Sequence, residues 1–591
     1  MRPQNPDSNT TLRSTAAVRV RPILRGIGIG VWLVVAGWAA AIGCIGLWLI
    51  RTGDGELREQ LKHWQFWALE LQFWLLVGLS WINLPALVRA LDLKKKDLVF
   101  PVAASALAFA LTTFVAPRTN RIYYDEQIYE SIGQNLADLR LAQMCNDGNV
   151  EYGVLQCSSG EYNKEPYGYS YLLSVAYRLF GVHEQAAFVM NTLFAAALVW
   201  VVFFASTALT GSVRAGGYAA VAIALIPDQL RWAHTAASEP SAAFACAYAV
   251  MTALAFVRLR STGSLWWMAV ATVFAAHFRP ECILVAPVVA AICLLYAPEE
   301  FLRRRLWWVA LGGLLLATAH IGHLAAVRHE GWGTSGTRLS LAFLAPNLRM
   351  NGWFYFGDAR FPVAFSALAL IALIPWRRAR GILVCSIYFL LFWGIFLFFY
   401  AGSYNYGADD RFSLMTYPPL AMLAGIGLWK LSDAIDANSR GPRSSRIVAG
   451  VLAAQFLWYM PVVRTVGEEA WAARADVAFA RSATAGLPGN SIVLTHNPSM
   501  FHLWGQSAAQ ASLASNSQSY AKNILAPRYA GGVFFHWNFW CNVADPVQQS
   551  FCTEVLNRFP HTLIRESRER DYRFAIYRLD VTSDRNIPPP Q

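Results

Sequence analysis

The sequence predicts a polytopic α-helical membrane protein that ends in a small α/β domain outside the cytoplasm. Of its 591 residues, 55% are apolar and only 15% are charged, whereas an ordinary soluble domain has about 25% charged residues. The apolar residues gather in segments of roughly 20 residues, the length that crosses a hydrocarbon core of about 30 Å. Beyond residue 464 the hydropathy falls, and helix and strand patterns alternate.

About thirteen segments are candidate transmembrane helices. They are 23–50, 65–88, 98–116, 186–209, 214–230, 238–257, 264–279, 281–297, 306–326, 362–375, 381–400, 412–430 and 446–463. The first is too long, and too far from a small-residue cleavage site, for a cleaved signal peptide, so we expect a permanent helix.

Basic residues near the ends of these segments predict the orientation, because Lys and Arg stay on the cytoplasmic side. A cytoplasmic N-terminus places most basic clusters inside: Arg13, Arg19, Arg21, Arg25, Lys94–Lys96, Arg258, Arg260, Arg303–Arg305, Arg377, Arg378, Arg380, Arg440, Arg443 and Arg446. We therefore expect a disordered cytoplasmic tail (1–20), a membrane domain (21–463) and three exported segments (117–185, 327–361 and 464–591). The net charge of +12 then reflects topology and contact with anionic membrane lipids, and no nucleic-acid partner is expected.

Cysteine positions test this orientation, because disulfides persist in oxidising compartments. Five of the nine cysteines fall in apolar segments and four in exported ones. Pairing neighbours predicts the disulfides Cys145–Cys157 and Cys541–Cys552, with four free thiols as the alternative.

The exported tail has the pattern of a small α/β domain. We expect a helix at 467–485 and strands at 491–495, 533–537, 561–566 and 572–579, which favours a three- or four-stranded, mostly parallel sheet.

A carboxylate pair, Asp125-Glu126, follows the third apolar segment at the start of the first exported loop. The apolar spacing over 125–143 predicts a helix lying on the membrane surface. Asp at a helix start often only caps the helix, and this alternative is as plausible as a chemical role when the pair is considered alone.

Other polar motifs gather at the outer ends of the predicted spans. They are Asn163-Lys164-Glu165-Pro166, Ser238-Glu239-Pro240, Arg279-Pro280-Glu281, and Tyr404-Asn405-Tyr406-Gly407 followed by Asp410-Arg411-Phe412. Each alone is explained by a cap, a turn or a snorkelling side chain. Their common location on one face indicates a site.

The order and spacing of these motifs resemble the protein O-mannosyltransferase superfamily and its bacterial relatives, such as the aminoarabinose transferase that acts on lipid A. The resemblance covers about residues 98–430 and rests on Tyr-Tyr-Asp-Glu-x-x-Tyr from Tyr123, Lys164-x-Pro166, Glu239-Pro240, Arg279-Pro280-Glu281 and Arg411-Phe412. The chain departs from the family pattern in its two additional N-terminal helices, in Glu165 where many relatives have proline, and in its tail.

The resemblance implies a multi-span GT-C glycosyltransferase in a bacterial plasma membrane that takes a polyprenyl-phosphate sugar on the exported side. It implies Asp125 as the catalytic base with Glu126 beside it, Glu239 as a further acidic site residue, and Lys164 and Arg411 near the lipid phosphate; we add Arg279 to this group. The acceptor is an envelope lipid, glycan or protein.

The expected chemistry agrees with this implication. A base must activate the acceptor hydroxyl, and a phosphate leaves without an acid once cations neutralise it. One carboxylate with Lys and Arg therefore suffices for an inverting displacement. Four tyrosines are candidate sugar-binding residues, with an interfacial aromatic belt as the alternative: Tyr123, Tyr124, Tyr167 and Tyr404.

No metal site is predicted, although Mg²⁺ or Mn²⁺ is left open. His320 and His323 have helical spacing but no apparent third ligand, which favours ordinary packing. Two other functions are considered: a secondary transporter or lipid flippase, which would carry midplane ionisable residues, and a non-catalytic sensor whose tail binds a partner. For an enzyme, we expect a core lacking residues 464–591 to retain some transfer to a small acceptor.

Overall fold

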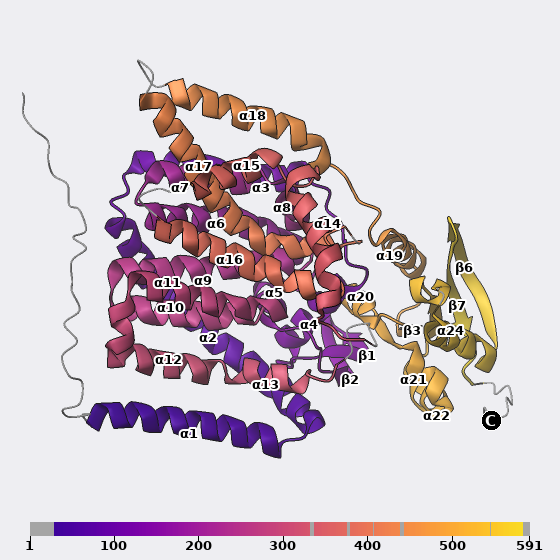
Figure 1. Cartoon of the computed structure of the whole chain (residues 1–591). Coiled ribbons are helices and arrows are strands. Elements are labelled where there is room, and N and C mark those ends of the chain that lie inside the picture. Colours follow the sequence, from indigo (N-terminus) through magenta and orange to yellow (C-terminus); the bar gives the residue numbers. More distant parts are fainter. Residues whose placement is uncertain are drawn as a thin grey trace, which may run out of the picture.

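The computed structural model describes residues 29–330, 336–374, 379–405, 407–437, 443–543 and 545–582. A bundle of helices makes up most of the molecule, and a sheet domain packs against one end of it (Figure 1). The predicted tail 1–20 lies outside the described residues, as do Arg21, Arg25, Arg377, Arg378, Arg440 and Tyr406.

Every predicted apolar segment contains a helix. The bundle helices are α1 (Ile29–Arg51), α2 (Asp54–Ala90), α3 (Val99–Phe114), α6 (Gln185–Thr210), α7 (Val213–Ala224), α9 (Glu239–Leu259), α10 (Thr262–Ala276), α11 (Val285–Tyr296), α12 (Arg304–Leu316), α13 (Thr318–Ala326), α15 (Val363–Leu373), α16 (Ala379–Phe398), α17 (Tyr417–Ala437) and α18 (Arg443–Val463). Among the described residues, seven helical stretches are long and apolar enough to cross a membrane, or eight if α12 and α13 form one bent span. Five further apolar helices are shorter.

The outside of the bundle is apolar, as a bilayer requires. Ile50, Trp81 and Phe114 are each more than four-fifths exposed, whereas large side chains of a soluble protein are mostly covered. The protein is therefore a multi-pass membrane protein.

Shorter helices lie between the apolar segments. They are α4 (Asp125–Asp138), α5 (Gly168–Phe180), α8 (Pro227–Ala233) and α14 (Leu344–Gly357), with the 3-10 helices η2 (Pro280–Leu284) and η5 (Asp409–Thr416). Helix α4 is buried along most of its length and packs against α5 and against α20 (Pro498–Leu503) of the sheet domain. Protein therefore covers both faces of this helix, and its location at the membrane surface stays a prediction.

The sheet domain is built around seven strands in the order β2-β1-β4-β3-β5-β7-β6. The strands are β1 (Met144–Glu151), β2 (Val154–Glu161), β3 (Ser491–Thr495), β4 (Ser507–Gln510), β5 (Gly532–Trp537), β6 (His561–Glu569) and β7 (Tyr572–Leu579). The helices are α19 (Trp471–Thr484), α20 (Pro498–Leu503), α21 (Ala511–Asn516), α22 (Gln518–Tyr520), α23 (Ala526–Arg528) and α24 (Pro546–Arg558), with η7 (Phe539–Asn542). Only β3–β4 and β3–β5 are parallel, so the predicted small, mostly parallel sheet is wrong.

The first exported loop contributes two of these strands. The hairpin β1–β2 pairs with β4 through Asp147 and Gly148. The sheet is therefore not confined to residues 464–591, and the predicted domain boundary cuts through it.

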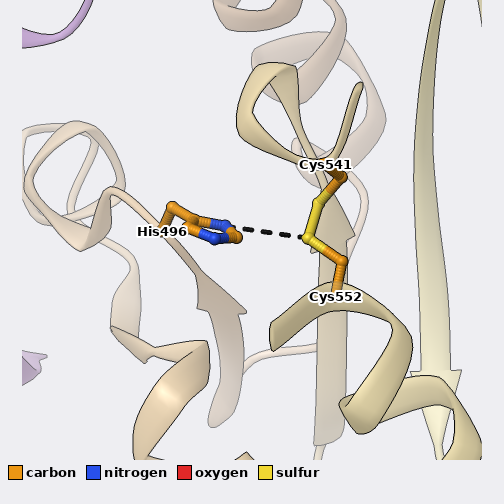
Figure 2. Close-up of side chains that lie close together, drawn as sticks. All are labelled: His496, Cys541 and Cys552. Atoms are coloured by element: carbon orange, nitrogen blue, oxygen red, sulfur yellow. Dashed lines mark hydrogen bonds between the residues drawn. A yellow bond between two sulfur atoms is a disulfide. The ribbon is translucent and has the colours of Figure 1, made fainter. Parts of the chain in front are cut away.

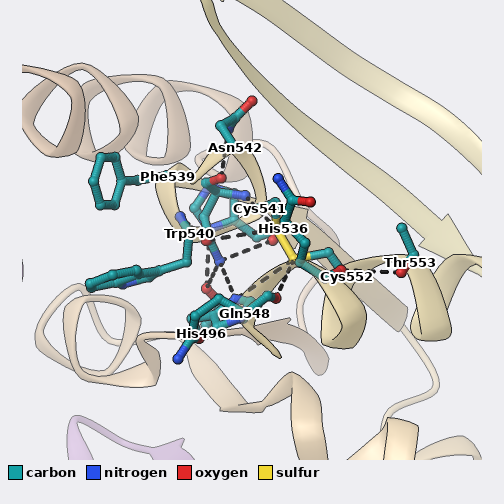
Figure 3. Close-up of a disulfide and its surroundings, with 12 residues drawn as sticks. His496, His536, Phe539, Trp540, Cys541, Asn542, Gln548, Cys552 and Thr553 are labelled. Carbon is teal, nitrogen blue, oxygen red and sulfur yellow. Dashed lines mark hydrogen bonds between the residues drawn. A yellow bond between two sulfur atoms is a disulfide. The ribbon is translucent and has the colours of Figure 1, made fainter. Parts of the chain in front are cut away.

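Both predicted cysteine pairs form disulfides. Cys145–Cys157 links the two hairpin strands, and Cys541–Cys552 links η7 to α24. Around the second bond, η7 places Phe539 and Trp540 on the side that faces the helical bundle (Figure 3).

Candidate active site

A cavity of about 860 Å³ brings four of the predicted site residues together. Asp125 comes from the start of α4, Lys164 from the loop before α5, Arg279 from the turn between α10 and η2, and Arg411 from η5. These elements are far apart in sequence, so only the fold explains their convergence. The cavity thus brings the predicted base together with the three predicted cationic side chains.

Asp125 is the first residue of α4, and its side chain is accessible within the cavity. The N-cap position belongs to Tyr124, and no side chain caps the helix. The surrounding protein raises the pKa of Asp125, which the positive charge of Arg411 partly opposes. The capping alternative therefore lacks the hydrogen bond that it requires, and the carboxylate faces the cavity.

Glu239 lies behind the cavity and is fully buried. Its Oε1 atom is 2.7 Å from Nη1 of Arg279 and 2.9 Å from Nε of Arg411. A shared carboxylate fixes two guanidinium groups side by side and offsets part of their mutual repulsion. Both guanidinium groups also lie over the ring of Phe412, at 5.5 and 4.8 Å. Glu239 thus orders the two arginines and is not among the residues that line the cavity; a catalytic role for it stays a prediction.

Glu126 makes structural contacts and is not among the residues that line the cavity; its catalytic role stays a prediction. Its buried carboxylate accepts hydrogen bonds from the backbone N–H groups of Arg121 (2.6 Å), Ile122 (3.1 Å) and Ala236 (3.0 Å). The side chain therefore fastens the turn before α4 to the segment before α9.

Tyr167 orders the loop that carries Lys164. The Tyr167 hydroxyl accepts the N–H of Asn163 at 2.6 Å, and the Asn163 side chain accepts the N–H of Glu165 at 2.8 Å. Glu165 lines the cavity beside Lys164, and burial raises the pKa of Glu165 to about 7. Tyr167 therefore shapes the loop and does not offer a sugar-stacking face.

The other predicted tyrosines also lie outside the lining of the cavity. The Tyr124 hydroxyl donates to Asp476, the Tyr123 ring lies 5.3 Å from that of Phe539, and Tyr404 is buried. The aromatic residues that do line the cavity include Tyr129 and Tyr400. Tyr129 is one helical turn beyond Asp125, and this spacing was a usable signal.

Three further charged residues line the cavity that were not given a role from the sequence, although Glu281 belongs to the predicted motif Arg279-Pro280-Glu281. Glu281 and Asp409 line it, as does Arg338 from the segment before α14. Glu281 forms an ion pair with Arg279, in which Nε of Arg279 lies 2.6 Å from the Glu281 carboxylate. Each belongs to or adjoins a predicted motif or lies in a predicted exported loop, so nearness to those motifs was the only signal available.

Three buried histidines lie behind Lys164 and Arg279. Nδ1 of His323 is 2.9 Å from the Tyr162 hydroxyl, and the rings of His277 and His320 are 4.9 Å apart. The backbone of this cluster is also in contact with α5, since the N–H of Gly168 donates to the carbonyl of His277 at 2.6 Å. His277 is the third histidine that the sequence did not associate with the other two.

Among the described residues, three potential metal-ligand atoms lie within 4.8 Å of one another only at His496, Cys541 and Cys552. Both sulfur atoms belong to one disulfide there, and the imidazole lies beside it (Figure 2). A disulfide offers no thiolate for a metal, so this group is a structural contact. Use of Mg²⁺ or Mn²⁺ at the cavity stays a prediction.

We expect a Gly168→Ala substitution to disturb the contact between α5 and the histidine cluster. A Cβ atom at Gly168 would lie 2.7 Å from the backbone oxygen of His277, and such overpacking typically costs about 1–3 kcal/mol. The melting temperature should fall, whereas Gly352→Ala, where the Cβ would meet open space, should leave it unchanged or higher. Equal melting temperatures for both variants would contradict the tight packing.

The turn that leads into α4 is held by the sheet domain and its linker. Arg121 forms a buried ion pair with Glu469, its Nη2 donates to the carbonyl of Thr465 at 3.2 Å, and Tyr124 donates to Asp476. Tyr123, between them, has a left-handed φ of 40°. Such a conformation persists only where the surroundings impose it. The sheet domain therefore fixes the backbone that presents Asp125.

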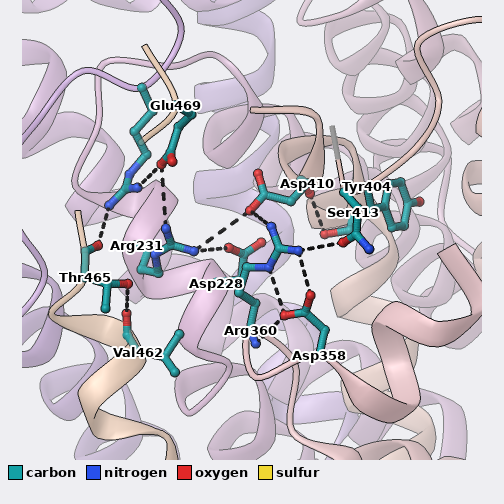
Figure 4. A network of polar contacts seen from close by, with 12 residues as sticks. Asp228, Arg231, Asp358, Arg360, Tyr404, Asp410, Ser413, Val462, Thr465 and Glu469 are labelled. Atoms are coloured by element: carbon teal, nitrogen blue, oxygen red, sulfur yellow. Dashed lines mark hydrogen bonds and ion pairs between the residues drawn. The ribbon is translucent and has the colours of Figure 1, made fainter. Parts of the chain in front are cut away.

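A buried charge network continues from this turn toward Arg411 (Figure 4). Arg231 lies 3.6 Å from Glu469, 3.3 Å from Asp228 and 3.9 Å from Asp410. Arg360 pairs with Asp410 at 2.9 Å and with Asp358 at 2.6 Å. Since Asp410 precedes Arg411, the network ties both sides of the cavity to one set of charges.

A second cavity of about 740 Å³ lies between bundle helices. Its walls are almost wholly apolar and come from α2, α5, α6, α9 and α10, with Phe278 beyond the end of α10. Phe278 lines this groove, and the next residue, Arg279, lines the charged cavity. Two consecutive residues of the chain therefore line the two different cavities.

No protein-family model and no curated protein matches the sequence. Among solved structures, ArnT from Cupriavidus metallidurans in the apo state matches with a TM-score of 0.52 at 15% identity, covering 81% of this chain and 97% of ArnT. Its structure bound to undecaprenyl phosphate matches with a TM-score of 0.50 at 16% identity, covering 82% and 98%. The chain therefore has the fold of the GT-C membrane glycosyltransferases, as the resemblance of its motifs predicts.

Proposed function

We propose that this protein is an inverting glycosyltransferase that moves a sugar from a polyprenyl-phosphate donor to a cell-envelope acceptor on the exported side of a bacterial inner membrane. The observation that carries the proposal is the cavity in which Asp125 faces Lys164, Arg279 and Arg411. The undecaprenyl phosphate in the matched ArnT structure is a lipid carrier of the kind that the proposed donor would release.

In the proposed reaction, Asp125 takes the proton of the acceptor hydroxyl as that oxygen attacks the anomeric carbon. The bond from the anomeric carbon to the phosphate oxygen breaks, and the electron pair leaves with the polyprenyl phosphate. Lys164, Arg279 and Arg411 stabilise the additional negative charge on that phosphate. A single displacement inverts the anomeric centre.

The prenyl chain would lie in the apolar groove next to this cavity. The groove has the wall chemistry that an isoprenoid needs, and the chain passes from Phe278 of its lining directly to Arg279 of the charged cavity.

The proposal includes about thirteen membrane spans, a cytoplasmic N-terminus and an exported sheet domain. Both disulfides lie in segments that this orientation places outside the cytoplasm, where such bonds persist. Mass mapping without reduction should find both bonds in protein taken from the membrane; free thiols at all four cysteines would contradict the orientation.

The direct test is incubation of the purified protein with a panel of polyprenyl-phosphate sugars and an envelope lipid extract as acceptor. Release of polyprenyl phosphate that depends on the acceptor supports the proposal. Movement of an intact lipid-linked sugar across vesicles, without its cleavage, would support the flippase alternative.

The proposed base predicts a pH dependence. Asp125 acts only when deprotonated, and burial raises its pKa, so kcat/KM should rise with pH along an acid limb above the ordinary range of aspartate. Because burial raises the pKa of Glu165 to about 7, this carboxyl is mostly neutral where Asp125 titrates, so Glu165→Gln should leave that limb in place. A kcat/KM that does not change with pH across the acid range would contradict the assigned base.

A further inference from the structure

A second polar pocket lies where the β1–β2 hairpin meets the sheet domain. It has a volume of about 580 Å³, within the range of small-molecule sites. The hairpin tip supplies one wall, and the loop between α19 and β3 together with the start of β4 supplies the other. The pocket therefore exists only because the first exported loop joins the C-terminal sheet.

The walls of the pocket are polar and carry no basic residue. Of the side chains that line it, Glu151 is the only charged one, and amide or hydroxyl groups come from Asn149, Asn490, Gln506 and Ser507. Planar amides and a carboxylate offer donors and acceptors in pairs. Such a lining suits a neutral polyhydroxylated ligand and disfavours a phosphate or a carboxylate.

Part of this lining is already ordered. The Ser507 hydroxyl donates to the Asn149 side chain at 2.6 Å, and that side chain in turn donates to Glu151. The Oε1 atom of Gln506 is buried and has no hydrogen-bond partner, although its amide nitrogen donates to Thr484 at 3.2 Å. Gln506 lines the pocket, and this contact with Thr484 orders its side chain.

An aromatic ring stands at the rim. Tyr152 lines the pocket, is fully exposed and occupies the hairpin tip with a left-handed φ of 52°. An exposed aromatic ring beside paired polar groups provides an apolar face next to hydrogen-bonding edges. A sugar ring has the matching surface, with an apolar face of C–H groups and a rim of hydroxyls.

We propose that this pocket, formed by Asn149–Tyr152, Leu487–Ser491, Val493 and Gly505–Ser507, binds a neutral saccharide unit of the acceptor. The assignment to the acceptor rests on the proposed function, whereas saccharide binding itself does not. Tyr152 stacks on the sugar, the Gln506 amide nitrogen donates to a hydroxyl oxygen, and Glu151 both accepts hydrogen bonds and excludes anionic sugars.

The test uses the full-length Asp125→Asn protein in detergent, without donor, so that binding is read apart from transfer. The probes are maltotriose, mannotriose and an N-acetylglucosamine trimer, with trigalacturonate as the anionic probe, titrated by calorimetry. At least one neutral probe should bind more tightly than trigalacturonate. Tyr152→Ala and Gln506→Ala should each weaken that binding roughly tenfold, and the exposed Leu563→Ala on β6 should not.

A second part of the test examines the negative charge of Glu151. Glu151→Gln should allow trigalacturonate to bind, whereas Glu554→Gln, on exposed α24, should not. The pocket assignment is overturned if no neutral probe binds, if both pocket variants bind like the Leu563→Ala control, or if trigalacturonate binds best to the protein with Glu151.

Transfer assays separate this inference from the proposed function. In the active enzyme, Tyr152→Ala should raise the KM for a saccharide acceptor and leave the KM for the donor unchanged. Saccharide binding without any transfer would contradict the proposed function alone. Transfer with an unchanged acceptor KM in both pocket variants would contradict the acceptor assignment.

Discussion

Replacing Asp125 with asparagine should abolish measurable sugar transfer while the protein keeps its fold. The substitution preserves the size of a side chain that caps nothing and faces the cavity, so the melting temperature should change little. The amide cannot accept the acceptor's proton, and loss of a general base typically costs 10²- to 10⁴-fold. The measurement is kcat for release of polyprenyl phosphate.

Asp138→Asn provides the matched control, because Asp138 ends the same helix and does not line the cavity. The control should keep wild-type kcat, and donor binding should survive in both variants because the three cations remain. Transfer at the wild-type rate by Asp125→Asn would refute the role of Asp125, and loss of donor binding in that variant would indicate a folding defect.

The sequence predicted the charged centre of the site because the signal was local. Asp125, Lys164, Arg279 and Arg411 each belong to a short motif at the outer end of an apolar segment, and positive-inside asymmetry assigned those ends to one side. The structure places all four around one cavity. Which carboxylates face that cavity was not local information: Glu126 and Glu239 adjoin the same motifs, but tertiary packing turns them toward backbone amides and arginines.

The tyrosines failed for a related reason. An aromatic residue near a membrane interface can belong to an interfacial belt, to the protein core or to a stacking site. The residue type alone does not indicate which way its side chain points. Helical spacing is more informative, because it places Tyr129 one turn from Asp125 on the same helix. Tyr124 is next to Asp125 in sequence, but its side chain points to Asp476.

The sheet was the least predictable part of the fold. Strand β1 pairs with β4 across more than 350 residues of sequence, and no local pattern specifies such a partner. The hairpin carries Asn, Asp and Gly residues that disfavour strands, and its disulfide and its neighbours compensate. The short range of sequence signals therefore explains why a separate tail domain was predicted.

This shared sheet changes the expectation for a protein without residues 464–591. Such a core was expected to retain transfer to a small acceptor, but it would lose Glu469 and Asp476, which hold the turn before Asp125. It would also lose the strand that pairs with β1. We now expect the truncated chain to lose transfer to every acceptor, including small ones.

Asp476→Ala should show the same dependence within the intact chain, with a fall in kcat of roughly 10²-fold. Asp476 accepts hydrogen bonds from Tyr124, from Nε2 of His536 at 2.9 Å and from the N–H of Phe539 at 3.3 Å. Without it, the Tyr124 contact that helps to hold the left-handed backbone at Tyr123 is lost, and a misplacement of about 1 Å at a catalytic group can cost 10²-fold. Because Lys164, Arg279 and Arg411 do not depend on this contact, the KM for the donor should change little.

Two further variants distinguish a misplaced Asp125 from an unfolded protein. Asp476→Asn keeps an oxygen for the Tyr124 hydroxyl and should recover much of the kcat, whereas Asp571→Ala, at an exposed turn of the same domain, should match the wild type throughout. A fall in kcat at constant donor KM, with the Cys541–Cys552 disulfide still protected from reduction, identifies a base that is out of place in a folded protein. An unchanged kcat in Asp476→Ala would show that the bundle alone positions Asp125, since Arg121 and Glu126 would then suffice to hold the turn.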